Sequence, residues 1–221
     1  MNLRKLLTHA GMLIGIVLCA HAFAAEPVKG KEYILVEPPQ PTSSGNKVEV
    51  LEFFWYACPH CFNLQPALKS WAKTMPKDVD FKRVPTVFRD SMIVHARMFY
   101  TLEAVGALEK LHQDVFHTFH EENRPLNDKQ AFLDWAGRKG VDVKKLAEAW
   151  DSFTVQTKTQ RAVQMTKLYG ITGTPSIVVA GKYLTAPSMT VTPSNSIDYD
   201  RFTAVINELT AMARKSHSAQ K

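Results

Sequence analysis

Two apolar runs in the first half of the chain have the length and composition of β-strands. Residues 48–56 are β-branched or aromatic and almost continuously apolar, which is typical of a strand buried on both faces of a sheet. Residues 79–88 form a second run, in which Pro85 favours the end of the strand or the edge of the sheet. A shorter β-prone run at 33–36 precedes a turn-rich stretch at 37–46.

Between the two long runs, the apolar positions change to the spacing of a helix. The residues at this spacing are Phe62, Leu64, Leu68 and Trp71. Pro59 suits the first turn, because the N–H that it lacks would have no helical partner there. A helix that begins at Pro59 makes Cys58 its N-cap residue.

The middle of the chain, 91–155, reads as a run of helices separated by glycine, proline and asparagine. Asn127, followed three residues later by Gln130, resembles a capping box, and Asp142 can cap the next helix. A further helix over 154–169 leads out of this block. We therefore expect a largely helical segment between the two halves of the sheet.

Strand character returns near the C-terminus, where 176–180, a turn at 181–182 and 183–185 predict a hairpin. Residues 200–213 predict a closing helix. The order is strand, helix, strand, helical block, hairpin and helix. It resembles a thioredoxin-like α/β fold with an inserted α-helical domain.

The predicted elements divide the chain into segments. We expect a signal peptide at 1–24 and a discontinuous thioredoxin-like domain formed by 25–90 and 156–215. The inserted helical domain is 91–155, and 216–221 is a flexible tail.

The N-terminal segment has the three parts of a secretory signal. Arg4 and Lys5 precede an apolar run at 10–20, and small residues lead up to a cleavage site after Ala24. The run is shorter than the ~20 residues of a membrane-spanning helix. An uncleaved anchor is the alternative, and Cys19 lacks the small preceding residue expected of a lipidated cysteine.

Composition adds limits to this picture. The 221 residues are 45% hydrophobic and 22% charged, which is enough to form a globular core. The net charge of +6 is spread among acids rather than clustered, so we expect no nucleic-acid binding.

Only two cysteines remain after the predicted cleavage, Cys58 and Cys61. A disulfide between them would close too small a loop to stabilise a fold appreciably. A structural zinc site would need four ligands, and only His60 lies nearby as a third. Redox chemistry is the remaining interpretation of the pair, and it requires neither a metal nor another cofactor.

The strand-to-helix position of Cys58 favours its thiolate. Free N–H groups and the positive end of the helix dipole face the sulfur. The dipole contributes roughly 0.3–1 kcal/mol, which is less than the ~1.36 kcal/mol of one pKa unit. His60 and the N–H groups near Cys61 can add to it, and a stabilised thiolate makes the disulfide form more oxidising.

The segment from Glu52 through Cys58-Pro59-His60-Cys61 resembles the active site of DsbA-type thiol:disulfide oxidoreductases. The resemblance implies a periplasmic enzyme that introduces disulfide bonds into reduced, unfolded client proteins. It also implies reoxidation by an inner-membrane, quinone-linked partner of the DsbB type. We expect a monomer.

The same resemblance assigns roles outside the cysteine pair. It implies a cis-proline at Pro175, with the backbone of Thr174 binding an extended client segment. It also implies that Glu52 exchanges a proton with Cys61, although Glu49 and Glu52 share a strand and either could face solvent.

Two residues depart from the family pattern. Gln65 stands where relatives can carry a second acid, which leaves Lys82 or Arg83 as candidate partners of Glu52. Thr174 is also typical of disulfide isomerases. An isomerase or reductase, or a non-catalytic client-binding chaperone, therefore stays as an alternative.

Other chemically capable residues have simpler interpretations. Trp55 and Tyr56 could form an apolar rim for clients, or one of them could belong to the core. The remaining candidates, expected to be surface or core histidines rather than metal ligands, are His95, His112, His117 and His120.

Overall fold

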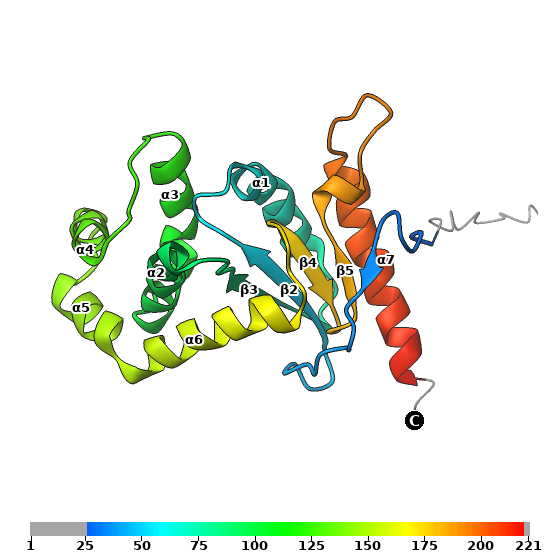
Figure 1. The fold of residues 1–221 in the computed structure, drawn as a ribbon, viewed down its shortest axis with the longest axis horizontal. Coiled ribbons are helices and arrows are strands. Elements are labelled where there is room, and N and C mark those ends of the chain that lie inside the picture. The colour runs from blue at the N-terminus through cyan, green and yellow to red at the C-terminus, as the bar shows by residue number, and fades with distance from the viewer. Residues whose placement is uncertain (1–25, 219–221) are drawn as a thin grey trace, which may run out of the picture.

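A five-stranded mixed sheet forms the centre of the computed structural model, which describes residues 26–218 (Figure 1). The predicted signal peptide lies outside the described residues. The sheet order is β1-β5-β4-β2-β3, and only β2 and β3 are parallel. The strands are β1 (Ile34–Leu35), β2 (Val48–Phe54), β3 (Val79–Pro85), β4 (Ser176–Val179) and β5 (Tyr183–Thr185).

Strand β2 is the strand that leads to the cysteine pair. All seven of its residues are buried, which confirms the expectation drawn from its continuous apolar run. It pairs with β3 on one side and β4 on the other. Strand β3 lies at the edge of the sheet and ends at Pro85, where a missing N–H removes no ladder bond.

Seven α-helices surround the sheet within the described residues. They are α1 (Pro59–Thr74), α2 (Ile93–Ala104), α3 (Leu108–His120), α4 (Lys129–Arg138), α5 (Val143–Asp151), α6 (Phe153–Leu168) and α7 (Tyr199–Ser218). Helices α2 to α5 form a group at one end of the molecule, and α6 returns from it to the sheet (Figure 1).

The two faces of β2 contribute to two different cores. Val48 and Val50 pack in a cluster with residues of α1 and α7. Leu51 and Phe53 pack in a second cluster with residues of the helical segment. Because side chains alternate along a strand, β2 connects the two cores.

Helix termini follow the predictions closely, with two corrections. Asp142 caps α5 as expected, but α4 is capped by Asp128, whose carboxylate accepts from the Ala131 N–H at 2.8 Å. Asn127, the predicted cap, instead contacts His95. The closing helix was predicted to end at 213 but continues to Ser218, so the first part of the predicted tail is helical.

The proposed division of the chain stays a prediction. Helix α6 runs without interruption across the predicted boundary between 155 and 156. In the part of the chain that the structure describes, no helix is both long enough and apolar enough to cross a bilayer.

Candidate active site

Cys58 lies at the junction of β2 and α1. It is the N-cap residue of α1, with extended backbone angles and Pro59 at the start of the helix. This matches the placement predicted from the apolar spacing. Its side chain is largely buried, and its Sγ lies 3.3 Å from the carbonyl oxygen of Thr174.

Hydrogen bonds to the sulfur lower the pKa of Cys58 to about 5. The largest effect comes from the Cys61 thiol, followed by the Thr174 side chain and the N–H groups of Cys61 and His60, while burial acts in the opposite direction. These donors stabilise the thiolate more than the helix dipole alone could. Cys58 is therefore the thiol that ionises first.

Cys61 occupies the opposite environment one helical turn further on. Its side chain is fully buried, and burial is the main reason that its pKa is raised. The neighbouring Cys58 sulfur and the charge of Glu52 raise this pKa further. One cysteine is thus prepared to be a thiolate, whereas the other needs a proton when it is reduced.

Thr174 and Pro175 form the wall that faces Cys58. The peptide bond between them is cis, as the resemblance implies. The Thr174 backbone makes no other hydrogen bond within the described residues than the contact of its carbonyl with Cys58. Its backbone N–H is therefore available to a bound polypeptide.

A groove of about 340 Å³ opens beside this wall. His60, Thr174 and Pro175 line one side of it, and Leu184 and Met189 are among its apolar residues. The His60 side chain is exposed, and its contribution to the Cys58 thiolate comes through its backbone N–H.

Glu52 is buried beneath the cysteines, on the same face of β2 as α1. Its Oε1 accepts from Gln65 Nε2 at 3.0 Å, and its Oε2 lies 3.2 Å from Arg83 Nε without hydrogen-bond alignment. Burial raises its pKa, although Arg83 and Gln65 act against the shift. Arg83, rather than Lys82, is therefore the partner of Glu52.

Gln65 connects Glu52 to the cysteine helix and to α3. Its Nε2 also donates to the Cys61 carbonyl at 3.2 Å, and its Oε1 accepts from Gln113 Nε2 at 3.0 Å. Since a carboxylate and a carbonyl can only accept, Gln113 must supply a donor to the remaining oxygen. Gln113 could not be identified from the sequence, because nothing in the sequence indicates that α3, which carries it, packs against Gln65.

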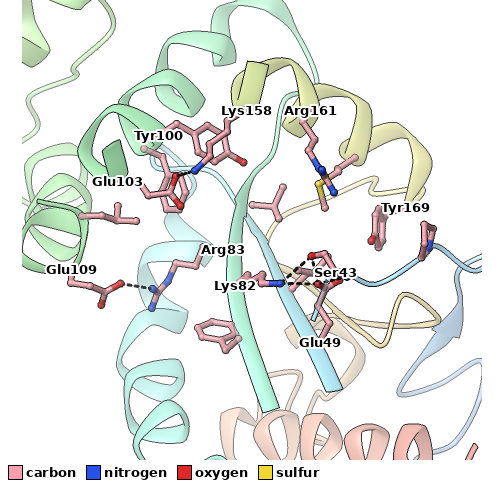
Figure 2. Close-up of a pocket in the computed structure, with 17 residues that line it drawn as sticks. Ser43, Glu49, Lys82, Arg83, Tyr100, Glu103, Glu109, Lys158, Arg161 and Tyr169 are labelled. Carbon is pink, nitrogen blue, oxygen red and sulfur yellow. Dashed lines mark hydrogen bonds and ion pairs between the residues drawn. The ribbon is translucent and has the colours of Figure 1, made fainter. Parts of the chain in front are cut away.

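Glu49 is also buried, but on the opposite face of β2. Its Oε2 accepts from Ser43 and Ser44, and it forms an ion pair of 3.0 Å with Lys82 (Figure 2). Burial raises the pKa of Glu49, but these partners outweigh it and the pKa is lowered. These contacts indicate a structural role for Glu49.

Of the two aromatic residues before Cys58, Tyr56 belongs to the core and Trp55 is partly exposed. Tyr56 is fully buried and contacts His112 Nδ1 through its hydroxyl at 3.0 Å. Trp55 is partly exposed and donates to His95 Nδ1 at 2.6 Å. Burial lowers the pKa of His95 to about 4, so this ring is a neutral acceptor.

The other histidines also make ordinary structural contacts. His117 pairs with Glu121 at 2.8 Å, and His120 stacks on Phe62. Across the described residues, no group of three or more potential ligands is arranged to hold a metal ion.

Comparisons with known proteins all point to one family. The sequence profile of the DSBA-like thioredoxin domain matches residues 68–199. The thiol:disulfide interchange protein DsbA of Burkholderia cepacia is 40% identical over 189 residues, covering 85% of this chain and 88% of that protein. The protein of the same name from Bordetella parapertussis is 40% identical over 206 residues, covering 93% and 95%.

Solved structures show the same similarity at the level of the fold. The crystal structure of Pseudomonas aeruginosa DsbA superposes with a TM-score of 0.78 at 33% identity, covering 88% of this chain and 97% of that one. The predicted fold class, a thioredoxin-like α/β fold with inserted helices, is thereby confirmed.

Proposed function

The chain belongs to the DsbA-like thioredoxin family and is a thiol:disulfide oxidoreductase that introduces disulfide bonds into other proteins, and we propose that Cys58 is its reactive sulfur. The observation that carries this assignment is the contrast between the two thiols. The pKa of Cys58 is lowered to about 5, whereas burial raises that of Cys61.

The reaction begins with the Cys58–Cys61 disulfide. A client thiolate attacks Cys58 Sγ, the bond between the two enzyme sulfurs breaks, and Cys61 leaves with the electron pair. Because the pKa of Cys61 is raised, this leaving sulfur requires a proton. Glu52, whose own pKa is raised by burial, donates that proton.

A second client thiolate completes the exchange. It attacks the client sulfur of the mixed disulfide, and Cys58 leaves as a thiolate. Two client thiols become one disulfide, and the enzyme disulfide becomes a thiol and a thiolate. The hydrogen bonds that lower the pKa of Cys58 also make it a good leaving group.

Client binding uses the wall opposite Cys58. The free backbone N–H of Thr174 pairs with an extended client segment, and the apolar groove beside Pro175 and His60 receives client side chains. Pro59 fixes the first turn of α1, so that the N–H groups of His60 and Cys61 point at the sulfur.

The cellular setting completes the proposal. We assign the protein to the periplasm, with a signal peptide at 1–24 cleaved after Ala24 and reduced, unfolded proteins as clients. Since each turnover leaves the enzyme reduced, an inner-membrane, quinone-linked partner of the DsbB type reoxidises it. A monomer suffices for this reaction, since both cysteines and the Thr174–Pro175 wall come from one chain.

Two single variants test the assignment of roles. Both Cys58→Ala and Cys61→Ala should abolish oxidation of a reduced, unfolded test protein. With glutathione disulfide, Cys61→Ala should accumulate a mixed disulfide at Cys58, whereas Cys58→Ala should form little, because Cys61 is buried. Equal trapping at both positions, measured by mass spectrometry, would contradict the assignment.

A further inference from the structure

A second groove lies along the outer edge of β3. It has a volume of about 540 Å³ and is bounded by β3, α2, α6 and the start of α3 (Figure 2). It shares no lining residue with the groove beside Cys58. Its size is that of a small-molecule site.

Three of the four cations that line this groove have acidic partners. Lys82 pairs with Glu49 and Asp80, and Lys158 pairs with Glu103 at 2.6 Å. Arg83 lies between Glu52 and Glu109. Two of the three acids that line the groove, Glu49 and Glu103, are thus paired with neighbouring lysines, and the third, Glu109, lies 3.9 Å from Arg83.

Arg161 is the exception among these cations. Its side chain is exposed and, within the described residues, forms no ion pair or hydrogen bond. Figure 2 places its guanidinium between Tyr100 on α2 and Tyr169 after α6. Its charge acts on both phenols, opposing the rise in pKa that burial gives to each.

The two tyrosine hydroxyls are also without partners. Tyr100 is only 9% exposed and Tyr169 only 5%, yet neither hydroxyl makes a hydrogen bond to another described residue. Their rings are held by Phe99 and Phe53, with centroid distances of 5.1 and 5.2 Å. Neither oxygen is among the buried side-chain atoms that lack a partner, so both hydroxyls reach the solvent in the groove and are free to donate to a ligand there.

The floor of the groove is apolar. It includes Leu51, Phe99 and Met165, which belong to or pack against the core beside the sheet. A ligand that fits here therefore combines an apolar part with a group that accepts several hydrogen bonds and carries negative charge.

We propose that this groove binds an organic carboxylate, held by the guanidinium of Arg161 and the hydroxyls of Tyr100 and Tyr169. The planar guanidinium matches a carboxylate with two parallel hydrogen bonds. The apolar part of the ligand rests on Leu51 and Met165. Both a small free acid and an acidic residue of a peptide have this chemistry.

Titration by NMR tests the site with three probes. The first is 4-phenylbutyrate, the second is its neutral amide, 4-phenylbutyramide, and the third is the peptide acetyl-Phe-Glu-amide. Arg161→Gln should weaken binding of the acid about tenfold or more, since it removes a charge-assisted pair. Tyr169→Phe, which keeps the ring, should weaken it by about two- to fivefold.

Matched controls separate this site from a general charge effect. Lys167→Gln removes an exposed cation from the same helix outside the groove and should leave binding unchanged. Arg161→Gln should leave client oxidation unchanged, so a failure of this proposal is distinct from a failure of the thiol chemistry.

Every result decides for or against the site. Binding of the acid or the peptide that depends on Arg161 and fails with the amide supports it, and the stronger of the two probes identifies the source. No binding at ~10 mM of either acid, far weaker than the ~1 mM of a weak specific ligand, would overturn it. Equal binding by the Arg161→Gln variant would do the same.

Discussion

Two buried glutamates on opposite faces of β2 show how differently one strand can treat the same residue type. Glu49 and Glu52 are 3% and 0% exposed. Two serines and Lys82 surround the Glu49 carboxylate, and its pKa is lowered. Glu52 has one aligned donor and an unaligned arginine, and its pKa is raised.

The difference separates a structural carboxylate from a reactive one. Burial acts on both groups in the same direction, so the hydrogen-bond partners decide the sign of the shift. A carboxylate whose hydrogen-bond and ion-pair partners outweigh the effect of burial stays ionised. One that is incompletely satisfied beneath a buried thiol can carry a proton to it.

The largest expected effect is on stability, at Glu49. Glu49→Ala should lower the free energy of unfolding by about 1–3 kcal/mol at neutral pH, because it leaves the Ser43 hydroxyl without its acceptor and Lys82 and Ser44 with Asp80 as their only acidic partner. Urea unfolding measures this. A loss below about 0.5 kcal/mol, the level of a surface substitution, would show that Glu49 has no structural role.

The pH dependence at Glu49 has a defined sign. Its pKa in the folded state lies below the ordinary 4.5, so its stabilising effect is present above that value and is lost as the pH falls through the folded pKa. The Glu49→Gln variant should therefore lose less stability on acidification than the wild type.

Glu52 should behave in the opposite way. Because its folded-state pKa is raised, its ionised form disfavours folding, and stability from this group increases as the pH falls toward 4.5. Glu52→Gln should change stability at neutral pH by less than about 1 kcal/mol. It should slow client oxidation about tenfold by removing a proton donor.

The role of Glu52 is tested by measuring stability and the rate of client oxidation on the same variant. Stopped-flow oxidation of a reduced peptide across pH, together with urea unfolding of the same samples, measures both effects. An unchanged rate would leave Glu52 without a part in the reaction.

A substitution at Gln65 should widen the difference in pKa between Glu52 and Glu49. Gln65→Glu places a second acid beside Glu52 and Cys61. The repulsion between like charges should raise the pKa of Glu52 and that of Cys61. The pH profile of client oxidation should move upward by about one unit. Gln65→Met is the uncharged control, and an identical profile for the two variants would show that the added charge has no influence.

The smallest expected effect concerns Gln113. A glutamate there could not donate to Gln65 Oε1, so Gln113→Glu should turn the Gln65 amide and present its oxygen to Glu52. The Glu52 pKa should then rise, but by less than with Gln65→Glu. Gln113→Leu removes the donor to Gln65 without replacing it by an acceptor. It should shift the pH profile of client oxidation less than Gln113→Glu does.

The sequence was most informative where local rules decide the structure. The buried strand β2 (Val48–Phe54, predicted at 48–56), the helix start at Pro59 and the Asp142 cap all follow from spacing and capping preferences. So does the edge position of the strand that ends at Pro85. The cis peptide bond between Thr174 and Pro175 agreed with a family resemblance rather than with any local pattern.

The sequence was least informative where partners come from distant elements. Nothing in the strand showed that both glutamates are buried, or that Arg83 rather than Lys82 faces Glu52. Those outcomes depend on the parallel register of β2 and β3, which pairs Glu52 with Arg83. The Asn127 cap was wrong because Asp128 competes for the same helix end.

The most direct test of the account is the ultraviolet absorbance of the Cys58 thiolate as a function of pH. The reduced wild-type protein should titrate with a midpoint near pH 5, and Cys58→Ala should lose this transition, since burial raises the pKa of the remaining Cys61. A wild-type midpoint near 9, the ordinary value of a thiol, would contradict the central claim that this site prepares one cysteine as a thiolate.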